Sequence, residues 1–220
     1  MYSNKTTLLL DMNSTFMFGE DNFGESENFS EYYHNIGGEL SGEEINEVIR
    51  YVYNYLDRRY PDEKYRECFP SIETVITDNS EYHFSSLALQ KIIHTFAYHE
   101  MGSIPSEYVD ILHKLNARYT LSVVIDIWAP KISWLSLFDD LGISQLFVAS
   151  SFSSDHGMVK PSPSSFNMVV EKLGVNKENC LMVGDSIRRD LGGAEAAGID
   201  CVLVGGAEHP NAVGCGCSPL

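Results

Sequence analysis

Basic side chains are scarce in this 220-residue sequence. It contains 15 lysines and arginines against 31 aspartates and glutamates, which gives a formal net charge of −16. A field of that sign repels nucleic acid and anionic lipid, so we expect neither as a partner. Any chemistry on a phosphate group would need a local positive charge, such as a metal ion, a lysine or a helix N-terminus.

Long apolar runs and cysteines are also few. No run approaches the roughly 20 residues that a membrane-spanning helix needs, and no basic segment leads into an apolar one as in a secretory signal. The five cysteines are odd in number and widely spaced, which favours free thiols in a reducing compartment. We therefore expect a cytoplasmic protein without membrane contact, and the sequence does not indicate its oligomeric state.

Short apolar runs alternate with helical patterns over much of the chain. Runs of this length are typical of buried strands in a parallel sheet, and they occur at residues 6–10, 121–125, 146–149, 180–183 and 201–204. Helical patterns occupy residues 106–116, 131–141, 163–173 and 187–197. The alternation predicts an α/β fold with a doubly wound parallel sheet. The tail from Gly205, with Cys215 and Cys217, is expected to be loosely ordered.

The segment between the first two strands has a different character. Ser41 and Glu44 fit a capping box, and the apolar residues behind them repeat at helical offsets until Pro61. Residues 16–35 are expected to form a loop, and further helices are expected at residues 71–77 and 85–99. We therefore predict an α/β core of residues 1–16 and 104–220, with residues 17–103 inserted as a small helical domain.

Acidic side chains follow two of the predicted strands. Asp11 comes directly after the first strand, and Asp185 and Asp190 follow the fourth. Open parallel sheets place their chemistry just past the carboxyl ends of their strands, and paired carboxylates can hold a hard cation. By residue type alone, Asp11 fits a solvated strand end equally well, and the second stretch fits a turn with an aspartate helix cap.

Residues 184–198 read Gly-Asp-Ser-Ile-Arg-Arg-Asp-Leu-Gly-Gly-Ala-Glu-Ala-Ala-Gly. This stretch resembles the fourth motif of the haloacid dehalogenase-like hydrolases, Gly-Asp-Ser-x-x-x-Asp-x-x-Gly-Ala-x-x-Ala-Gly. Asp11 resembles the first motif of that family, and Lys160, which precedes Pro161, resembles the third. The resemblance covers residues 6 to 204 in the right order. It implies a Rossmann-like core, with the helical insertion at the place of the family's type-one cap.

The resemblance also implies a role for each of these residues. Asp11 would be the nucleophile and would form an aspartyl-phosphate. Mg²⁺ would be held by a carboxylate oxygen of Asp11, the backbone carbonyl of Asn13 and the side chain of Asp185. Lys160 would hold the nucleophile and the phosphoryl oxygens. Two further residues would lie just outside the metal ligands: Ser186 and Asp190, the latter orienting waters or the lysine.

The chain departs from the family pattern at two positions. Asn13 replaces the aspartate that protonates the leaving group and later deprotonates water, and an amide can do neither. That removes general acid–base catalysis worth about 10²–10⁴-fold. In the second motif, Ile125 replaces a serine or threonine that binds the phosphoryl group, and Asp126 follows it. A carboxylate there would repel phosphate.

Several functions therefore stay open. The leading hypothesis is a Mg²⁺-dependent phosphatase or phosphotransferase, slow because of Asn13, that acts on a small phosphorylated metabolite. The second is a non-catalytic member that binds Mg²⁺ or a phosphorylated ligand. A dehalogenase would work without a metal, which the intact fourth motif disfavours. A phosphonatase-like enzyme would use a lysine of the insertion for a Schiff base, and Lys64 and Lys91 are the candidates.

Two further groups of side chains have no assigned role. Tyrosines cluster in the insertion, and we expect them mainly to pack within it: Tyr32, Tyr33, Tyr51, Tyr53, Tyr55, Tyr60 and Tyr65. Arg188 and Arg189 in the fourth motif fit a phosphate contact or a solvated position equally well.

Overall fold

The computed structural model describes residues 4–216 and is built on a six-stranded sheet with the order β3-β2-β1-β4-β5-β6. All its strand pairs are parallel, which confirms the predicted doubly wound α/β fold. The strands are β1 (Thr7–Leu10), β2 (Thr120–Ile125), β3 (Phe147–Phe152), β4 (Cys180–Gly184), β5 (Asp200–Leu203) and β6 (Gly214–Cys215). Strands β1 and β4 lie at the centre and are buried along their whole length.

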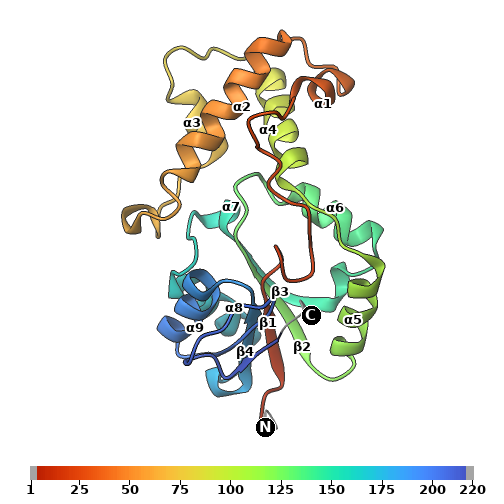
Figure 1. Cartoon of the computed structure of the whole chain (residues 1–220), viewed down its shortest axis with the longest axis vertical. Coiled ribbons are helices and arrows are strands. Elements are labelled where there is room, and N and C mark those ends of the chain that lie inside the picture. The colour runs from red at the N-terminus through yellow and green to blue at the C-terminus, as the bar shows by residue number, and fades with distance from the viewer. Residues whose placement is uncertain (1–3, 217–220) are drawn as a thin grey trace.

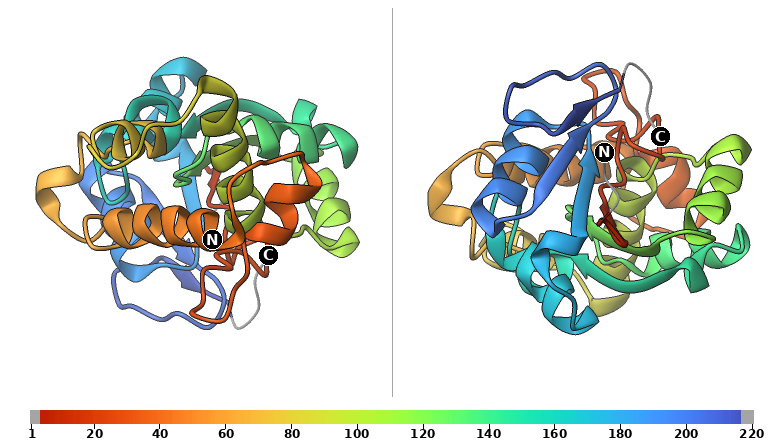
Figure 2. Two further views of the ribbon diagram at one scale, coloured as in Figure 1. Left: turned by 90° about the horizontal axis from the view of Figure 1, so that it is seen from above. Right: turned by 90° about the horizontal axis from the view of Figure 1, so that it is seen from below.

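Helices cover both faces of the sheet (Figures 1 and 2). Successive residues of β1 point to opposite faces, so Leu8 and Leu10 join one apolar cluster while Leu9 joins the other. Helices α5 (Ser106–Asn116) and α6 (Ile132–Asp140) contribute to the first cluster. Helices α8 (Pro163–Leu173) and α9 (Gly192–Ala197) contribute to the second. Helix α9 packs so closely against α8 that a Cβ on Gly193 would lie 2.5 Å from the Phe166 ring.

The segment between β1 and helix α5 is helical and lies beyond the carboxyl ends of the strands (Figure 1). It contains α1 (Ser30–Asn35), α2 (Gly42–Asp57), α3 (Ile72–Thr77) and α4 (Ser86–Glu100), which we call the inserted helices. The predicted capping box is confirmed, since Glu44 N–H donates to Ser41 Oγ at 3.2 Å and Ser41 N–H donates to Glu44 Oε2 at 2.9 Å.

Several contacts join the inserted segment to the core. The two linkers meet where Phe18 N–H donates to the Ser103 carbonyl and Ser103 N–H donates to the Phe18 carbonyl, at 2.9 and 2.8 Å. Beside them, the buried Glu100 carboxylate accepts the N–H groups of Trp128 and Ala129, in the loop after β2, at 2.5 and 2.8 Å. The Trp128 indole packs among rings of the inserted segment: Tyr53, Tyr60, Phe69 and Phe96.

The structure corrects four local predictions. Residues 30–35 form helix α1 within the expected loop, although Tyr33 is its single fully buried side chain. Strand β3 extends to Phe152 and leads into a short helix, α7 (Ser153–His156). The expected helix at 187–197 begins as a π-helical turn, Ile187–Leu191, before α9. The tail adds β6 to the sheet edge, while Cys217 lies outside the described residues. The remaining short turns are 3₁₀ segments at Glu63–Tyr65, Ser144–Leu146 and Lys177–Asn179.

Candidate active site

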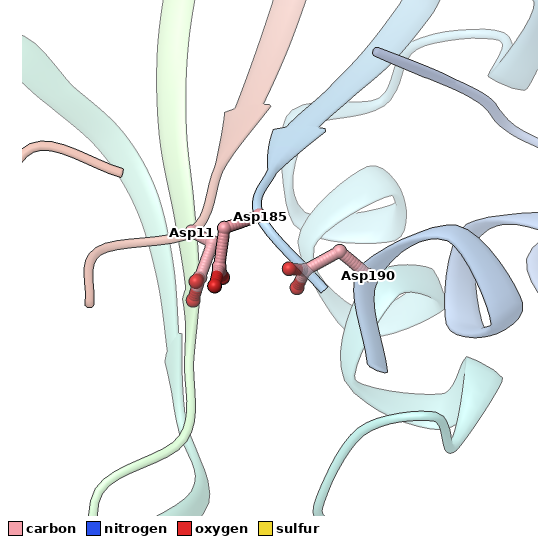
Figure 3. A group of neighbouring side chains, drawn as sticks. All are labelled: Asp11, Asp185 and Asp190. Atoms are coloured by element: carbon pink, nitrogen blue, oxygen red, sulfur yellow. The ribbon is translucent and has the colours of Figure 1, made fainter. Parts of the chain in front are cut away.

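Two central strands bring the predicted carboxylates together. Strands β1 and β4 are neighbours, and Asp11 N–H extends their pairing by donating to the Val183 carbonyl at 2.9 Å. Asp185 follows the end of β4, and Asp190 lies on the π-helical turn behind it. One oxygen from each of the three aspartates lies within 4.8 Å of the others (Figure 3). Asp11 and Asp185, more than 170 residues apart in the sequence, thus lie together at the carboxyl edge of the sheet.

Asp190 is fully buried, and both of its oxygens are occupied. Oδ1 accepts from Lys160 Nζ at 2.7 Å, and Oδ2 accepts from Ser186 N–H at 2.9 Å. The carboxylate lies directly against Gly184, where a Cβ would come within 2.4 Å of Asp190 Cγ. Asp190 is therefore fixed by protein groups, and the metal-binding capacity of the group rests mainly on Asp11 and Asp185.

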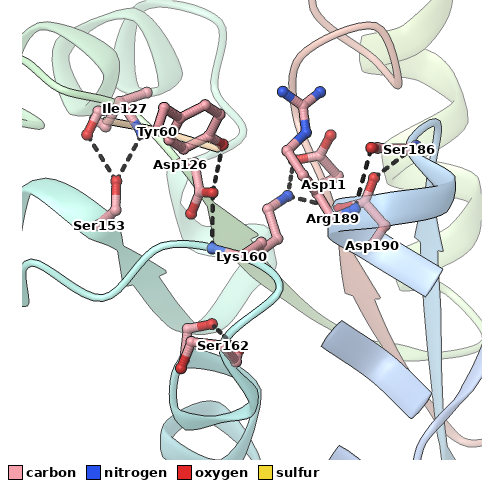
Figure 4. Close-up of polar contacts among 11 residues, drawn as sticks. Asp11, Tyr60, Asp126, Ile127, Ser153, Lys160, Ser162, Ser186, Arg189 and Asp190 are labelled. Carbon is pink, nitrogen blue, oxygen red and sulfur yellow. Dashed lines mark hydrogen bonds and ion pairs between the residues drawn. The ribbon is translucent and has the colours of Figure 1, made fainter. Parts of the chain in front are cut away.

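Lys160 lies between two of the carboxylates and is 2% exposed. Its Nζ donates to Asp11 Oδ1 at 2.6 Å as well as to Asp190 (Figure 4). Burial disfavours the ammonium charge, but Asp11 and Asp190 together hold the pKa of Lys160 above its usual range. Burial and the charge of Asp190 raise the pKa of Asp11 to about 7, against the opposing effect of Lys160. Lys160 and the nearby Arg189 thus offset part of the charge of the three carboxylates, and the carboxylate negative charge that remains favours a cation.

Two buried side-chain oxygens that follow β1 and β4 have no protein donor. Asp185 Oδ1 and Asn13 Oδ1 are both buried and have no hydrogen-bond partner within the part of the chain that the structure describes. Leaving a buried acceptor unpaired costs about 1–3 kcal/mol, and a hard divalent ion prefers such oxygen ligands. The residues therefore fit Mg²⁺ by charge and by donor type.

The end of β2 supplies no hydroxyl to this edge of the sheet. Ile125 is buried and apolar, and Asp126 Oδ2 accepts from the Lys160 backbone N–H at 2.9 Å and from the Tyr60 hydroxyl at 2.6 Å (Figure 4). Burial raises the pKa of Asp126. Asp126 therefore connects the lysine loop to the inserted segment. The expectation that Tyr60 mainly packs within the insertion missed this bond, because only its position just before Pro61 distinguishes it from the other tyrosines.

The two lysines considered for Schiff-base chemistry lie elsewhere. Lys91 Nζ donates to the Gly37 carbonyl within the insertion, and Lys64 is exposed. Within residues 4–216, neither forms a hydrogen bond or ion pair with a residue of the carboxylate group.

A crevice of about 490 Å³ lies between the inserted segment and the core. Its lining includes Tyr55 and Phe69 of the inserted segment, and Trp128 and residues 153–157 of the core. A larger hollow, of about 780 Å³, is lined by the linker residues Gly19 and Gly102 and by Glu27. None of the three aspartates lines either hollow.

None of the helices in residues 4–216 has the length and apolar character needed to cross a membrane.

Comparison with known proteins agrees with this arrangement. The family model described as haloacid dehalogenase-like hydrolase matches residues 6–198. A phospholysine phosphohistidine inorganic pyrophosphate phosphatase from Xenopus laevis is 47% identical over 45 residues, 20% of this chain and 17% of that protein. The match therefore spans less than a fifth of that relative's length.

Solved structures resemble the whole chain at low sequence identity. The magnesium-bound putative HAD-hydrolase YfnB from Bacillus subtilis has a TM-score of 0.59 at 19% identity, over 96% of this chain and 93% of that one. A 2-haloacid dehalogenase from Pseudomonas syringae pv. Tomato has a TM-score of 0.63 at 18% identity, over the same shares. These likenesses establish the fold.

Proposed function

Because this chain belongs to the haloacid dehalogenase-like hydrolases, we propose that it is a Mg²⁺-dependent phosphatase or phosphotransferase acting on a small phosphorylated metabolite. One observation carries the proposal: the buried Asp11 carboxylate, oriented by Lys160, lies beside an Asp185 oxygen that lacks a protein donor. The phosphatase name of the Xenopus relative supports the substrate class, and the magnesium in the Bacillus structure supports the metal.

Asp11 performs the bond-making steps of this mechanism. Its second carboxylate oxygen attacks phosphorus, the bond to the leaving oxygen breaks, and the leaving group departs with the electron pair. Water then attacks the aspartyl-phosphate, which releases phosphate and restores the carboxylate. Lys160 holds Asp11 in place for both steps. Asp11, the Asn13 backbone carbonyl and Asp185 would hold Mg²⁺, which would supply positive charge for the phosphoryl oxygens.

Asn13 makes both proton transfers slow. Its amide cannot protonate the leaving group or take a proton from the attacking water, so both protons must be exchanged with solvent. Leaving groups that need little protonation are therefore favoured in the first step. Hydrolysis of the aspartyl-phosphate is then expected to limit turnover.

We assign the roles of cap and core to the inserted segment and the sheet domain, as the family pattern suggests. Residues 17–103 act as a cap over a core of residues 1–16 and 104–220, and the cap excludes water when it closes. Tyr60 is a cap side chain that reaches the core, through its bond to Asp126. The protein acts in the cytoplasm, with neither nucleic acid nor membrane as a partner.

The test is hydrolysis of an aryl phosphate with and without Mg²⁺. The wild type should turn over slowly and only with Mg²⁺, and Asn13→Asp should be about 10²–10⁴-fold faster. Asp11→Asn in either background is the control and should abolish turnover. Absence of phosphate release and of a phosphorylated Asp11 in both the wild type and Asn13→Asp would exclude the enzyme hypothesis.

A second candidate is a non-catalytic member that binds Mg²⁺ and a phosphorylated ligand. Asn13 favours it, because the aspartate that it replaces serves proton transfer during turnover. It predicts Mg²⁺-dependent phosphate binding without phosphate release, even after Asn13→Asp. Dehalogenation is disfavoured by the donor-free Asp185 oxygen, and chloride release from a 2-haloacid would show otherwise.

A further inference from the structure

Arg189 is a cation at the site without a partner. It lies on the π-helical turn directly before Asp190, and its half-buried side chain extends beside Asp11 (Figure 4). Its guanidinium makes no hydrogen bond and no ion pair with any residue in the described part of the chain. A guanidinium carries five N–H donors in a fixed fork, so all of these donors remain open at this position.

The surroundings keep this side chain charged. Burial opposes the charge of Arg189, but Tyr60, Asp11 and Asp190 hold its pKa above the usual range. The guanidinium carbon lies 5.8 Å from the centre of the Tyr60 ring, which is itself fixed by the bond to Asp126. The inserted segment thus flanks the guanidinium on the side away from the carboxylates.

Two other donors at this edge are already committed. Lys160 Nζ donates to two carboxylates, and the Tyr60 hydroxyl donates to Asp126. Ile125 has no hydroxyl to offer. Arg188 is exposed, with its guanidinium carbon 5.9 Å from the centre of the same Tyr60 ring. A phosphoryl group that reached Asp11 would therefore meet Arg189 as an open donor beside that carboxylate, and a planar guanidinium suits its oxygens in a two-point contact.

We propose that Arg189 binds the transferring phosphoryl group, and so replaces the hydroxyl that Ile125 cannot supply. This inference rests on the proposed function. It makes a phosphate monoester dianion, rather than a haloacid, the ligand that this arrangement selects, since two negative charges match the guanidinium and the bound metal together.

The test measures binding of inorganic phosphate in the presence of Mg²⁺ by titration calorimetry, alongside aryl phosphate hydrolysis. Arg189→Gln should weaken phosphate binding by about 10- to 100-fold, as expected for a charged hydrogen-bonding pair. Arg189→Lys should recover part of that loss, because an ammonium keeps the charge but not the two-point contact. Arg118→Gln is the matched control, since Arg118 is exposed just before the start of β2, at the opposite end of that strand from the site, and should change binding by less than about twofold.

The outcomes separate this inference from the proposed function. If the wild type binds phosphate with Mg²⁺ and Arg189→Gln binds it equally well, the assignment of Arg189 is wrong while the proposed function stands. If neither the wild type nor Asn13→Asp binds phosphate or hydrolyses the ester, both fail. Thermal unfolding checks that the variants fold. If Arg189→Gln does not fold, Arg189→Lys provides the test. Phosphate binding by that variant as tight as in the wild type would contradict the two-point contact.

Discussion

At the scale of single residues, the chemistry of the site depends on the residue at position 13, where asparagine replaces the aspartate of the family pattern. Asn13 matches aspartate in shape, but it cannot release a proton. Asp11 and Lys160 were predicted from the sequence because motif spacing identifies them. Arg189 was named only together with Arg188, and Tyr60 only as one of seven tyrosines, because the contact of Tyr60 with the core depends on how the inserted helices lie over the sheet. No local pattern encodes that packing.

Replacing Lys160 by methionine tests how the buried charges are balanced. Asp11 and Asp190 would lose their shared ammonium, so we expect the free energy of unfolding to fall by about 3–5 kcal/mol at pH 7. Urea denaturation measures it, and Lys172→Met, at an exposed position on α8, should change it by less than about 0.5 kcal/mol.

The loss should shrink as the pH falls towards 5. Lys160 opposes the raised pKa of Asp11, so without the lysine the folded Asp11 carboxylate holds its proton more strongly, and the variant gains more stability at lower pH than the wild type does. An equal loss at pH 5 and pH 7 would mean that Lys160 acts through packing alone.

Tyr60→Phe tests the bond between the inserted segment and Asp126. Loss of the hydroxyl leaves a buried carboxylate with one fewer donor, so the free energy of unfolding should fall by about 1–3 kcal/mol in urea denaturation. Tyr65→Phe is the control, because its hydroxyl has no hydrogen bond to a described residue, and it should change little. Equal effects of the two variants would contradict a role for the Tyr60–Asp126 bond.

At the scale of elements, periodicity located most helices and strands well. The five predicted strands and the amphipathic helix α2 lie where the apolar patterns place them. The misses have physical causes. Helix α1 buries too little apolar surface to show a period, and Ser150 and Ser151 conceal the end of β3, which is held by pairing with β2. Strand β6 has two residues and forms only because β5 offers an open edge.

Helix α4 ends in a buried acid that should make stability depend on pH. Burial raises the pKa of Glu100 to about 8, against two backbone donors that favour the charged form. Between about pH 4.5 and 8 the folded state therefore holds a proton that the unfolded chain releases, so this contribution to stability falls as the pH rises. The free energy of unfolding of the wild type minus that of Glu100→Gln, from urea denaturation, should decline across this window. A constant difference would contradict the raised pKa.

At the scale of the whole molecule, the net charge of −16 makes a bound cation stabilising in two ways. It neutralises the three carboxylates locally, and it reduces the repulsion of the folded chain with itself. The family and the parallel sheet were predictable from the motifs and their alternation. The way the inserted helices rest on the core was not, because it depends on contacts such as Trp128 with rings far away in sequence.

Mg²⁺ should therefore raise the unfolding temperature. At a concentration 100 times the dissociation constant, the stabilisation is about 2.7 kcal/mol. Asp185→Asn should lose this response while its metal-free form stays at least as stable as the wild type, because one buried charge is removed. Scans with Mg²⁺, with a chelator and with sodium chloride at matched ionic strength measure it. A sodium response equal to the Mg²⁺ response would reveal screening rather than a site.

The paired linkers at Phe18 and Ser103 have a mechanical consequence. Because each linker donates a hydrogen bond to the other, they should bend together, and the inserted helices should swing as one body about a single axis. Opening by that swing would have to break the Tyr60–Asp126 bond and separate Trp128 from its rings in one step. Access to Asp11 would then be all-or-none, and lengthening one linker by a few residues should convert it into graded motion.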